Sequence, residues 1–173
     1  MMRLVRLAVV VLLVSVALSV SFVRTSRAQT GSPQNLADRA AIQNLIVAYG
    51  TALDTLDADG YAAVFTEDAE LDVAGNVRKG RQQIRAIVTG LQESRAASKA
   101  KGTPTAALYH VISNTAIEIV SASQGRHHSY WQTIRVGANN QIIVGAIGRY
   151  DDELVKRDGR WLIRSRKIMP FTN

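Results

Sequence analysis

The 173-residue sequence contains no cysteine, so it can form neither a disulfide framework nor a thiol-linked lipid anchor. It also lacks a metal-binding motif: His127 and His128 are adjacent, and adjacent side chains on a strand point to opposite faces. A nucleophile elbow and a glycine-rich phosphate loop are missing as well. Because the polar residues are spread thinly over a mostly apolar chain, we expect a lined pocket with no metal and no cofactor.

An export leader is predicted at the N-terminus. Arg3 and Arg6 precede an apolar run over residues 7–23, and Ser26 and Ala28 supply the small residues of a cleavage site. We therefore expect export to the periplasm or secretion after cleavage. The alternative is an uncleaved membrane anchor, because the apolar run is nearly long enough to span a bilayer. The expected parts of the chain are a signal peptide over 1–28, a flexible lead-in over 29–36 and one domain over 37–173.

Much of the positive charge belongs to this leader. The whole chain has a formal net charge of +7, but four of its 21 Lys and Arg residues lie within 1–28 and all 14 acidic residues lie after it, which leaves +3. The remaining basic clusters, "VRKGRQQIR" and "SKAKG", have no interleaved aromatic residues and are typical of solvated helix faces. We expect no nucleic-acid partner, and no membrane contact once the leader is removed.

Helical periodicity dominates the first half of the domain. Apolar residues recur at helical spacing over Leu36–Leu56, and Asp57 is a plausible N-cap for a short second helix that ends near Phe65. A third helix is predicted over Arg81–Lys101, where glycine and proline follow. Between the second and third helices we expect a short hairpin with Gly75–Asn76 at its tip.

The second half of the domain has the period of strands. Its four predicted strands are separated by the turn-prone segments "SASQG", "GANN" and "RDG". Helices followed by an antiparallel meander indicate an α+β fold, with the helices covering one face of a curved sheet. The predicted strands are Ala106–Ser121, Arg126–Val136, Gln141–Lys156 and Arg160–Met169.

Two polar residues interrupt the first of these strands. Strict alternation places His110 and Asn114 on one face with Ile112 and Ala116, and a concave face would direct both polar side chains beneath the helices. The alternative is a structural histidine that its neighbours satisfy. Asp54 is a candidate partner because the C-terminal end of a helix disfavours an isolated carboxylate. Its place on the helical wheel, beside the apolar stripe, favours a solvated aspartate.

Three further side chains are candidates for the concave face. Arg166 and Arg164 belong to the same predicted strand, and we expect one of these cations to look inward and the other outward at the rim. The hydroxyl of Tyr49, which lies within the first helix's apolar stripe, needs a partner if it is buried. Trp131 is compatible with simple core packing. The outer face of the sheet is expected to suit a partner subunit, since we place Val111, Ile117 and Ile119 there.

Several segments resemble the SnoaL-like domains of the nuclear transport factor 2-like superfamily, which includes polyketide cyclases, scytalone dehydratase, ketosteroid isomerase and a hexachlorocyclohexane dehydrochlorinase. The likeness covers about 37–168 and implies a cone-shaped curved antiparallel sheet, with three N-terminal helices enclosing an apolar cavity. It also implies a carboxylate at Asp54, a catalytic base at His110 and a cavity arginine at Arg166. The segments that carry the resemblance are "ADRAAIQNLIVAYGTALDTLD", "FTEDAELDVAG", "YHVISNTAIEI" and "GRYDDELVKRDGRWLIRSRKI".

The chain also departs from these relatives. Scytalone dehydratase has a second functional histidine where this sequence has Trp131, and a tyrosine where it has Leu53. The oxyanion pair of ketosteroid isomerase has no clear counterpart. These differences argue against assigning any one of the named activities.

The resulting hypothesis is an exported, cofactor-independent lyase or isomerase that acts on a small apolar organic molecule. His110 would be the general base, Asp54 would orient it, and Arg166 would stabilise developing charge. The alternative is a non-catalytic small-ligand-binding or assembly domain on the same fold. A homodimer or higher homo-oligomer is expected. The predicted substrate-binding residues are Tyr49, Asn114, Trp131, Ala146 and Tyr150.

Overall fold

The structure, a computed structural model, describes residues 32–103, 105–137 and 140–171. The predicted signal peptide, its cleavage site and most of the lead-in lie outside the described residues. Within the described ranges, no helix has the length and apolar character needed to cross a membrane.

Within the described ranges, three helices form where helical periodicity predicts them. They are α2 (Pro33–Thr55), α3 (Ala58–Ala63) and α4 (Arg81–Ala100). The predicted N-cap is confirmed, because the Asp57 side chain accepts a hydrogen bond of 2.9 Å from the backbone N–H of Gly60. Just beyond α4, Gly102 has a φ of +67°, a conformation that glycine adopts readily and that ends the helix.

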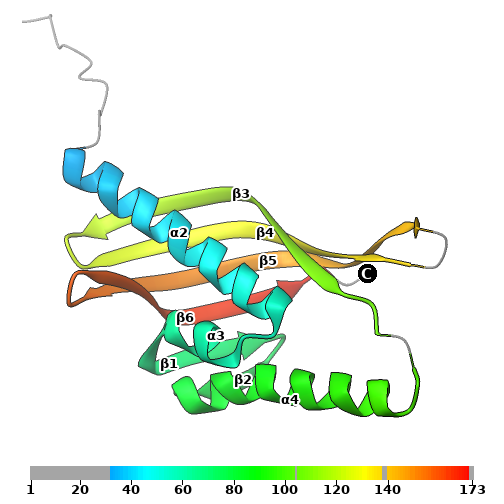
Figure 1. Cartoon of the computed structure of the whole chain (residues 1–173). Coiled ribbons are helices and arrows are strands. Elements are labelled where there is room, and N and C mark those ends of the chain that lie inside the picture. Colours follow the sequence, from blue (N-terminus) through cyan, green and yellow to red (C-terminus); the bar gives the residue numbers. More distant parts are fainter. Residues whose placement is uncertain (1–31, 104, 138–139, 172–173) are drawn as a thin grey trace, which may run out of the picture. The chain divides into compact units, whose positions relative to one another are not determined.

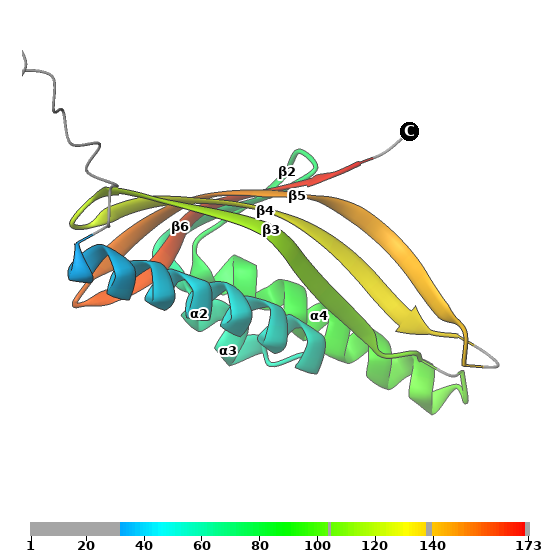
Figure 2. The same ribbon diagram turned by 90° about the horizontal axis from the view of Figure 1, so that it is seen from above.

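In the part of the chain that the structure describes, six strands form a single curved sheet in the order β2-β1-β6-β5-β4-β3. The last four strands are the predicted antiparallel meander, and the sheet is completed by β1, which pairs in parallel with β6. All three helices lie on the concave side of the sheet (Figures 1 and 2). The strands are β1 (Phe65–Val73), β2 (Asn76–Lys79), β3 (Leu108–Ser121), β4 (Gln124–Val136), β5 (Ile142–Arg157) and β6 (Arg160–Pro170).

The hairpin between β1 and β2 turns one residue earlier than predicted. Asn76 pairs with Val73, so the turn consists of Ala74 and Gly75. Both turn residues have positive φ, at +51° and +90°, as a type I′ turn requires. The predicted tip at Gly75–Asn76 is therefore wrong by one position.

A bulge in β3 overturns the prediction of strict alternation along this strand. Asn114 has a φ of +51°, and the pairing with β4 shifts register between Ser113 and Ala116. Beyond the bulge the two faces exchange residues. Ile117 and Ile119 pack against the core and Ala116 is exposed. Asn114 and Ala116 therefore do not continue the face of His110, and the two isoleucines do not belong to the outer face.

Helix α2 is fixed to the sheet along its whole length. Near its N-terminal end, the buried Asp38 accepts hydrogen bonds from Lys156 Nζ at 2.7 Å and Trp161 Nε1 at 3.0 Å. The bond from Lys156 and then that from Trp161 hold the pKa of Asp38 below its usual value. Further along, Ile42 and Tyr49 are fully buried against the sheet. These contacts set the position of the C-terminal end of α2 over β3.

A row of three polar residues crosses the concave face in the middle of the core. His127, Asp152 and Arg166 are successive cross-strand partners on β4, β5 and β6, and their side chains are completely buried. Asp152 accepts bonds from Arg166 Nε at 2.7 Å and Nη2 at 2.6 Å, and it lies 2.6 Å from His127 Nδ1. The Arg166 guanidinium packs on the rings of Tyr49 and Tyr150, with its Cζ atom 3.8 Å and 4.4 Å from the two ring centroids.

Opposing effects act on the carboxylate of this row. Burial favours the neutral form of Asp152, but the charge and hydrogen bonds of Arg166, with His127, outweigh burial and lower its pKa. Because the folded pKa lies below the ordinary value of 3.8, the carboxylate stabilises the fold above that pH. This contribution disappears as the pH falls through the folded pKa.

We predict that Asp152→Ala lowers the free energy of unfolding by about 3–5 kcal/mol, because it leaves the Arg166 cation buried without a partner. Replacing both residues with apolar ones, as in Asp152→Leu with Arg166→Met, is expected to be much less damaging. Urea unfolding at pH 7 measures both effects. The difference in free energy of unfolding between wild type and Asp152→Ala should become smaller as the pH is lowered below 4. If Asp152→Ala is as stable as wild type at pH 7, the carboxylate does not stabilise the buried row.

Candidate functional site

His110 and Asp54 meet between the start of β3 and the end of α2. His110 Nδ1 lies 2.6 Å from Asp54 Oδ1, and the backbone N–H of His110 donates to both carboxylate oxygens, at 3.0 Å and 3.2 Å. Both side chains are mostly buried, with 11% of His110 and 18% of Asp54 exposed. The interpretation of Asp54 as a solvated aspartate is therefore wrong, and the pairing implied by the family resemblance is present.

The end of α2 places the carboxylate where it needs partners. The helix closes with bonds from Leu56 N to Leu53 O and from Asp57 N to Ala52 O, which is a Schellman motif. Leu56 has a φ of +56° at the position where glycine is usual. A negative charge at this end opposes the helix dipole, so the two N–H groups of His110 compensate an otherwise unfavourable carboxylate.

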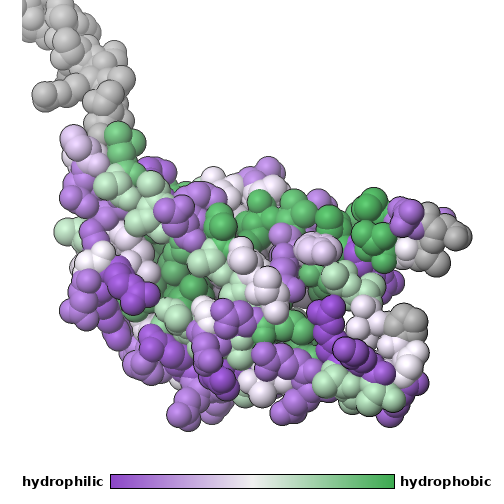
Figure 3. Space-filling model, viewed as in Figure 1, coloured by the Kyte–Doolittle hydropathy of each residue, from purple (hydrophilic) through white to green (hydrophobic). Residues whose placement is uncertain are grey.

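A pocket of about 210 Å³ opens beside this pair. One part of its wall is apolar and comes from α2, α4 and β3. The other part is polar and comes from α4 and the segment that follows it. Figure 3 shows the surface hollowed between the C-terminal end of α4 and the strand ends above it. The described lining consists of Leu53, Asp54, Leu56, Leu91, Ser94, Arg95, Ser98, Thr105, Ala106, Leu108 and His110.

The geometry of the pair determines which ring nitrogen of His110 is free. Asp54 engages Nδ1, so a neutral imidazole with its proton on Nδ1 exposes an unprotonated Nε2 to the pocket. Among the described residues, no side chain or backbone group bonds to Nε2. A carboxylate in this position can fix the orientation and tautomer of an imidazole that acts as a proton acceptor. The same helix end is tied to α4, since Gln92 Nε2 donates to the Leu56 carbonyl at 2.7 Å.

Arg166 does not lie beside His110, and this corrects the role predicted for it. His110 is opposite Thr133 on β4, whereas Arg166 belongs to the row of His127, six positions away along that strand. Six residues of strand span roughly 20 Å. The Arg166 guanidinium is also fully enclosed by Asp152 and two tyrosine rings. Its position fits a structural cation rather than contact with a substrate in the pocket.

The five predicted substrate-binding residues also lie outside the described lining of the pocket. Tyr49, Trp131 and Tyr150 are buried in a continuous aromatic cluster, with Tyr150 5.7 Å from each of the other two rings. Asn114 is exposed at the β3 bulge. Ala146 is exposed on β5, where its N–H donates to Thr133 Oγ1 at 2.9 Å. Aromatic packing thus occupies the part of the concave face where these residues were expected to line a cavity.

The pocket's polar wall was not predicted from the sequence. The apolar stripe of α4 runs through Ile84, Val88 and Leu91, and the same helical spacing continues to Ser94 and Ser98. The sequence feature that could have indicated this wall is the change from large apolar to small polar residues along one helix face. Arg95 lies beside that face and also lines the pocket.

The other two histidines confirm that neighbouring side chains point apart. His127 is buried next to Asp152, while His128 is partly exposed and pairs with Asp151. Within the described ranges, no group of three or more His, Asp or Glu side chains is arranged to hold a metal ion.

Comparison with known proteins identifies the family and the fold. A family profile described as "SnoaL-like domain" matches residues 34–167. Among solved structures, the chain is similar to a Mycobacterium tuberculosis protein of unknown function, with 23% identity, a TM-score of 0.69 and coverage of 84% of this chain and 79% of that one. A comparison with curated protein sequences found no match.

Two further similar structures carry the names of enzymes. A candidate scytalone dehydratase from Novosphingobium aromaticivorans has 24% identity and a TM-score of 0.66, and the match covers 82% of this chain and 89% of that one. A hexachlorocyclohexane dehydrochlorinase from Novosphingobium barchaimii has 24% identity and a TM-score of 0.66, over 82% and 92% of the two chains. At this level of identity the likeness establishes the fold.

We predict that the His110 ring carries its proton on Nδ1 when neutral and that its backbone amide exchanges slowly, because Asp54 accepts from both groups. Nitrogen-15 NMR of labelled protein reads both signals. In Asp54→Ala the amide should exchange faster and the ring should show a mixture of tautomers, while Asp57→Ala, which removes only the α3 cap, should leave both signals unchanged. An unaltered His110 spectrum in Asp54→Ala would contradict the pairing.

Proposed function

Because the chain belongs to the SnoaL-like domain family, we propose that it is a lyase or isomerase in which His110 removes a proton from carbon. The observation that carries the proposal is the 2.6 Å contact between His110 Nδ1 and Asp54 at the wall of a pocket. Two similar structures are named as a candidate dehydratase and a dehydrochlorinase, both eliminations, and these names support the reaction class.

The proposed step uses each atom of the pair. His110 Nε2 accepts the proton of a substrate C–H bond, and the ring becomes an imidazolium held by Asp54. The electron pair of that bond either forms a double bond as a leaving group departs or moves onto a conjugated oxygen. In the first case the product is an alkene; in the second, return of the proton to another carbon completes an isomerisation. Neither outcome requires a redox cofactor.

The walls of the pocket favour a small substrate with an apolar body. Four leucine side chains line it, and its volume of about 210 Å³ is below the roughly 300–1,000 Å³ typical of drug-sized ligand sites. Contact with these apolar walls would orient the reacting carbon towards His110. The four leucines are Leu53, Leu56, Leu91 and Leu108.

We predict that His110→Gln lowers kcat by on the order of 10²–10⁴-fold on any substrate found by screening elimination and isomerisation reactions, because glutamine cannot accept the proton. Asp54→Asn should also lower kcat, since an amide neither fixes the tautomer nor stabilises the imidazolium. His128→Gln is the matched control, because His128 also pairs with an aspartate but is not among the described residues that line this pocket. Unchanged turnover in His110→Gln would exclude the proposed base. Saturable ligand binding without turnover in wild type would favour the alternative, a non-catalytic binding domain.

We also propose that the protein forms a homodimer through the outer face of its sheet. Cross-strand pairing places a group of exposed apolar side chains together on this face of β3, β4 and β5. The ring centroids of Phe171 and Tyr130 lie 5.9 Å apart. Contiguous exposed apolar surface of this kind is typical of an interface. The group consists of Tyr109, Val111, Tyr130, Val144, Ile147 and Phe171.

We predict that Ile147→Lys shifts the protein from dimer to monomer in sedimentation-velocity experiments, because a charge at the centre of the patch opposes its burial. Val77→Lys is the control, since Val77 is an equally exposed apolar residue on the distant strand β2. A wild-type protein that sediments as a monomer at high micromolar concentration would contradict the proposed dimer.

A further inference from the structure

The polar wall of the pocket contains a cation without a carboxylate partner. Arg95 lines the pocket on α4, and no ion pair or hydrogen bond involves it among the residues that the structure describes. The other two arginines of α4, both in its first half, have partners. Arg81 pairs with Glu67, and Arg85 bonds to Asp59 at 2.7 Å. Arg95 is therefore the arginine of α4 that remains available for a ligand.

Three hydroxyl groups lie on the same wall. Ser94, Ser98 and Thr105 line the pocket with Arg95, so hydrogen-bond donors gather on this side. The leucines occupy other parts of the lining. A molecule in the pocket therefore meets an apolar surface around His110 and a donor-rich surface on α4.

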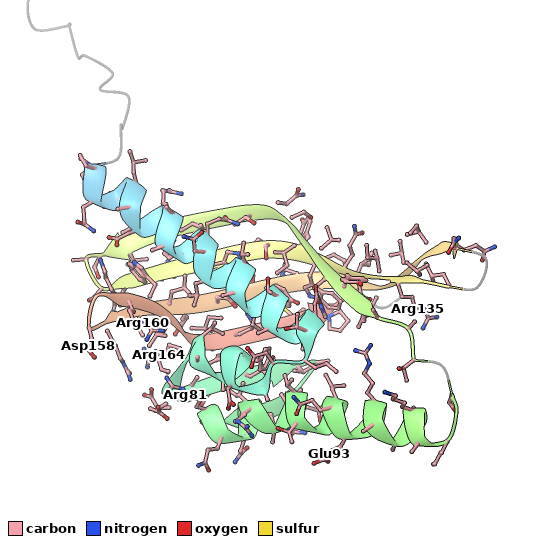
Figure 4. The ribbon with its side chains drawn as sticks, in the orientation of Figure 1. Arg81, Glu93, Arg135, Asp158, Arg160 and Arg164 are labelled. Atoms are coloured by element: carbon pink, nitrogen blue, oxygen red, sulfur yellow. The ribbon has the colours of Figure 1, made fainter. Side chains whose placement is uncertain are left out.

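A second guanidinium lies close to the pocket's rim. On β4, Arg135 is opposite Leu108, a lining residue, and it comes two positions after Thr133, the partner of His110. Figure 4 shows Arg135 projecting from the strand end towards the gap above α4, whereas Glu93 lies on the side of α4 turned away from the sheet. The carboxylate of Asp54 is the acidic group of the described lining, and His110 already engages it.

Two features of the site oppose an anion, and both are offset. The C-terminal end of α4 carries the negative end of its helix dipole, but Lys99 and Lys101 are located there. The Asp54 carboxylate would repel an anion placed beside it. An anion bound at Arg95 instead contacts α4, while the rest of the molecule extends towards His110.

We propose that the substrate of this pocket is a small organic anion whose carboxylate or phenolate oxygen binds Arg95 and the neighbouring hydroxyls. This inference rests on the proposed function and names the substrate class for it. A neutral apolar substrate would gain nothing from the exposed guanidinium of Arg95. An anionic oxygen forms charge-assisted hydrogen bonds there, and these are stronger than neutral ones. Arg135 adds longer-range attraction at the rim.

The test compares two probes of the same shape, benzoate and benzamide, titrated into the full-length protein and its variants at low salt. Backbone amide shifts in NMR spectra give the dissociation constant and locate the site. In wild type, we expect benzoate to bind about tenfold more tightly than benzamide, as charge-assisted hydrogen bonds imply. The largest shifts should be at Ser94, Leu108 and His110. High salt should reduce this preference.

The variants assign the preference to its residue. Arg95→Gln should lose most of the preference for benzoate, and Arg135→Gln should lose a smaller part of it. Arg164→Gln is the matched control, an exposed arginine on β6 near Arg160 at the opposite end of the sheet, and should behave as wild type (Figure 4). Equal affinity of wild type for the two probes, an undiminished preference in Arg95→Gln, shifts confined to other surfaces, or no saturable binding of benzoate would each overturn the proposal.

This experiment separates the inference from the proposed function. Binding of benzoate does not require proton transfer, so His110→Gln should still prefer benzoate to benzamide. If that preference persists while no elimination or isomerisation is found, the proposed reaction fails and the anion site stands. If turnover depends on His110 but neutral and anionic substrates react alike in wild type and Arg95→Gln, the substrate class fails and the reaction stands.

Discussion

One carboxylate at the end of α2 determines the organisation of the candidate site. Asp54 accepts the backbone N–H of His110 and also lies 2.6 Å from its imidazole Nδ1. The backbone bond fixes where β3 starts relative to the helix, and the side-chain bond fixes which ring nitrogen faces the pocket. Neither partner suits its position alone, because a carboxylate opposes the dipole at a helix end and an imidazole is polar among apolar neighbours. Together they form a unit in which each polar group has a hydrogen-bond partner.

The rest of the concave face holds this unit in place without contributing to the pocket. The buried row of His127, Asp152 and Arg166 locks three strands together, and Tyr49 and Tyr150 enclose the guanidinium. This packing occupies the middle of the sheet and leaves the pocket at one end, between α4 and the start of β3. Charge in the core therefore supports the fold, while we propose chemistry and binding roles for the charges at the pocket, Asp54 and Arg95.

Periodicity alone predicts most of the fold. The three helices and the four long strands, though not their exact bounds, follow from the spacing of apolar residues, and the cap at Asp57 follows from residue type. The bulge at Asn114 is invisible to such patterns, because a positive φ at a non-glycine residue depends on tertiary context. The same limit hides the parallel pairing of β1 with β6, since periodicity within a strand does not specify its neighbour.

The site was predicted in part and for a different kind of reason. The pairing of His110 with Asp54 follows from family resemblance, whereas the helical wheel favours a solvated aspartate. Arg166 was misplaced because cross-strand register decides its row, and Arg95 was missed because a solvated helix face and a pocket wall have the same composition. The most direct test is a crystal structure of the protein with a substrate identified by screening elimination and isomerisation reactions. We expect a ligand carbon about 3–3.5 Å from His110 Nε2, with Asp54 still bonded to Nδ1. A ligand bound elsewhere, or an imidazole turned away from both ligand and Asp54, would contradict this expectation.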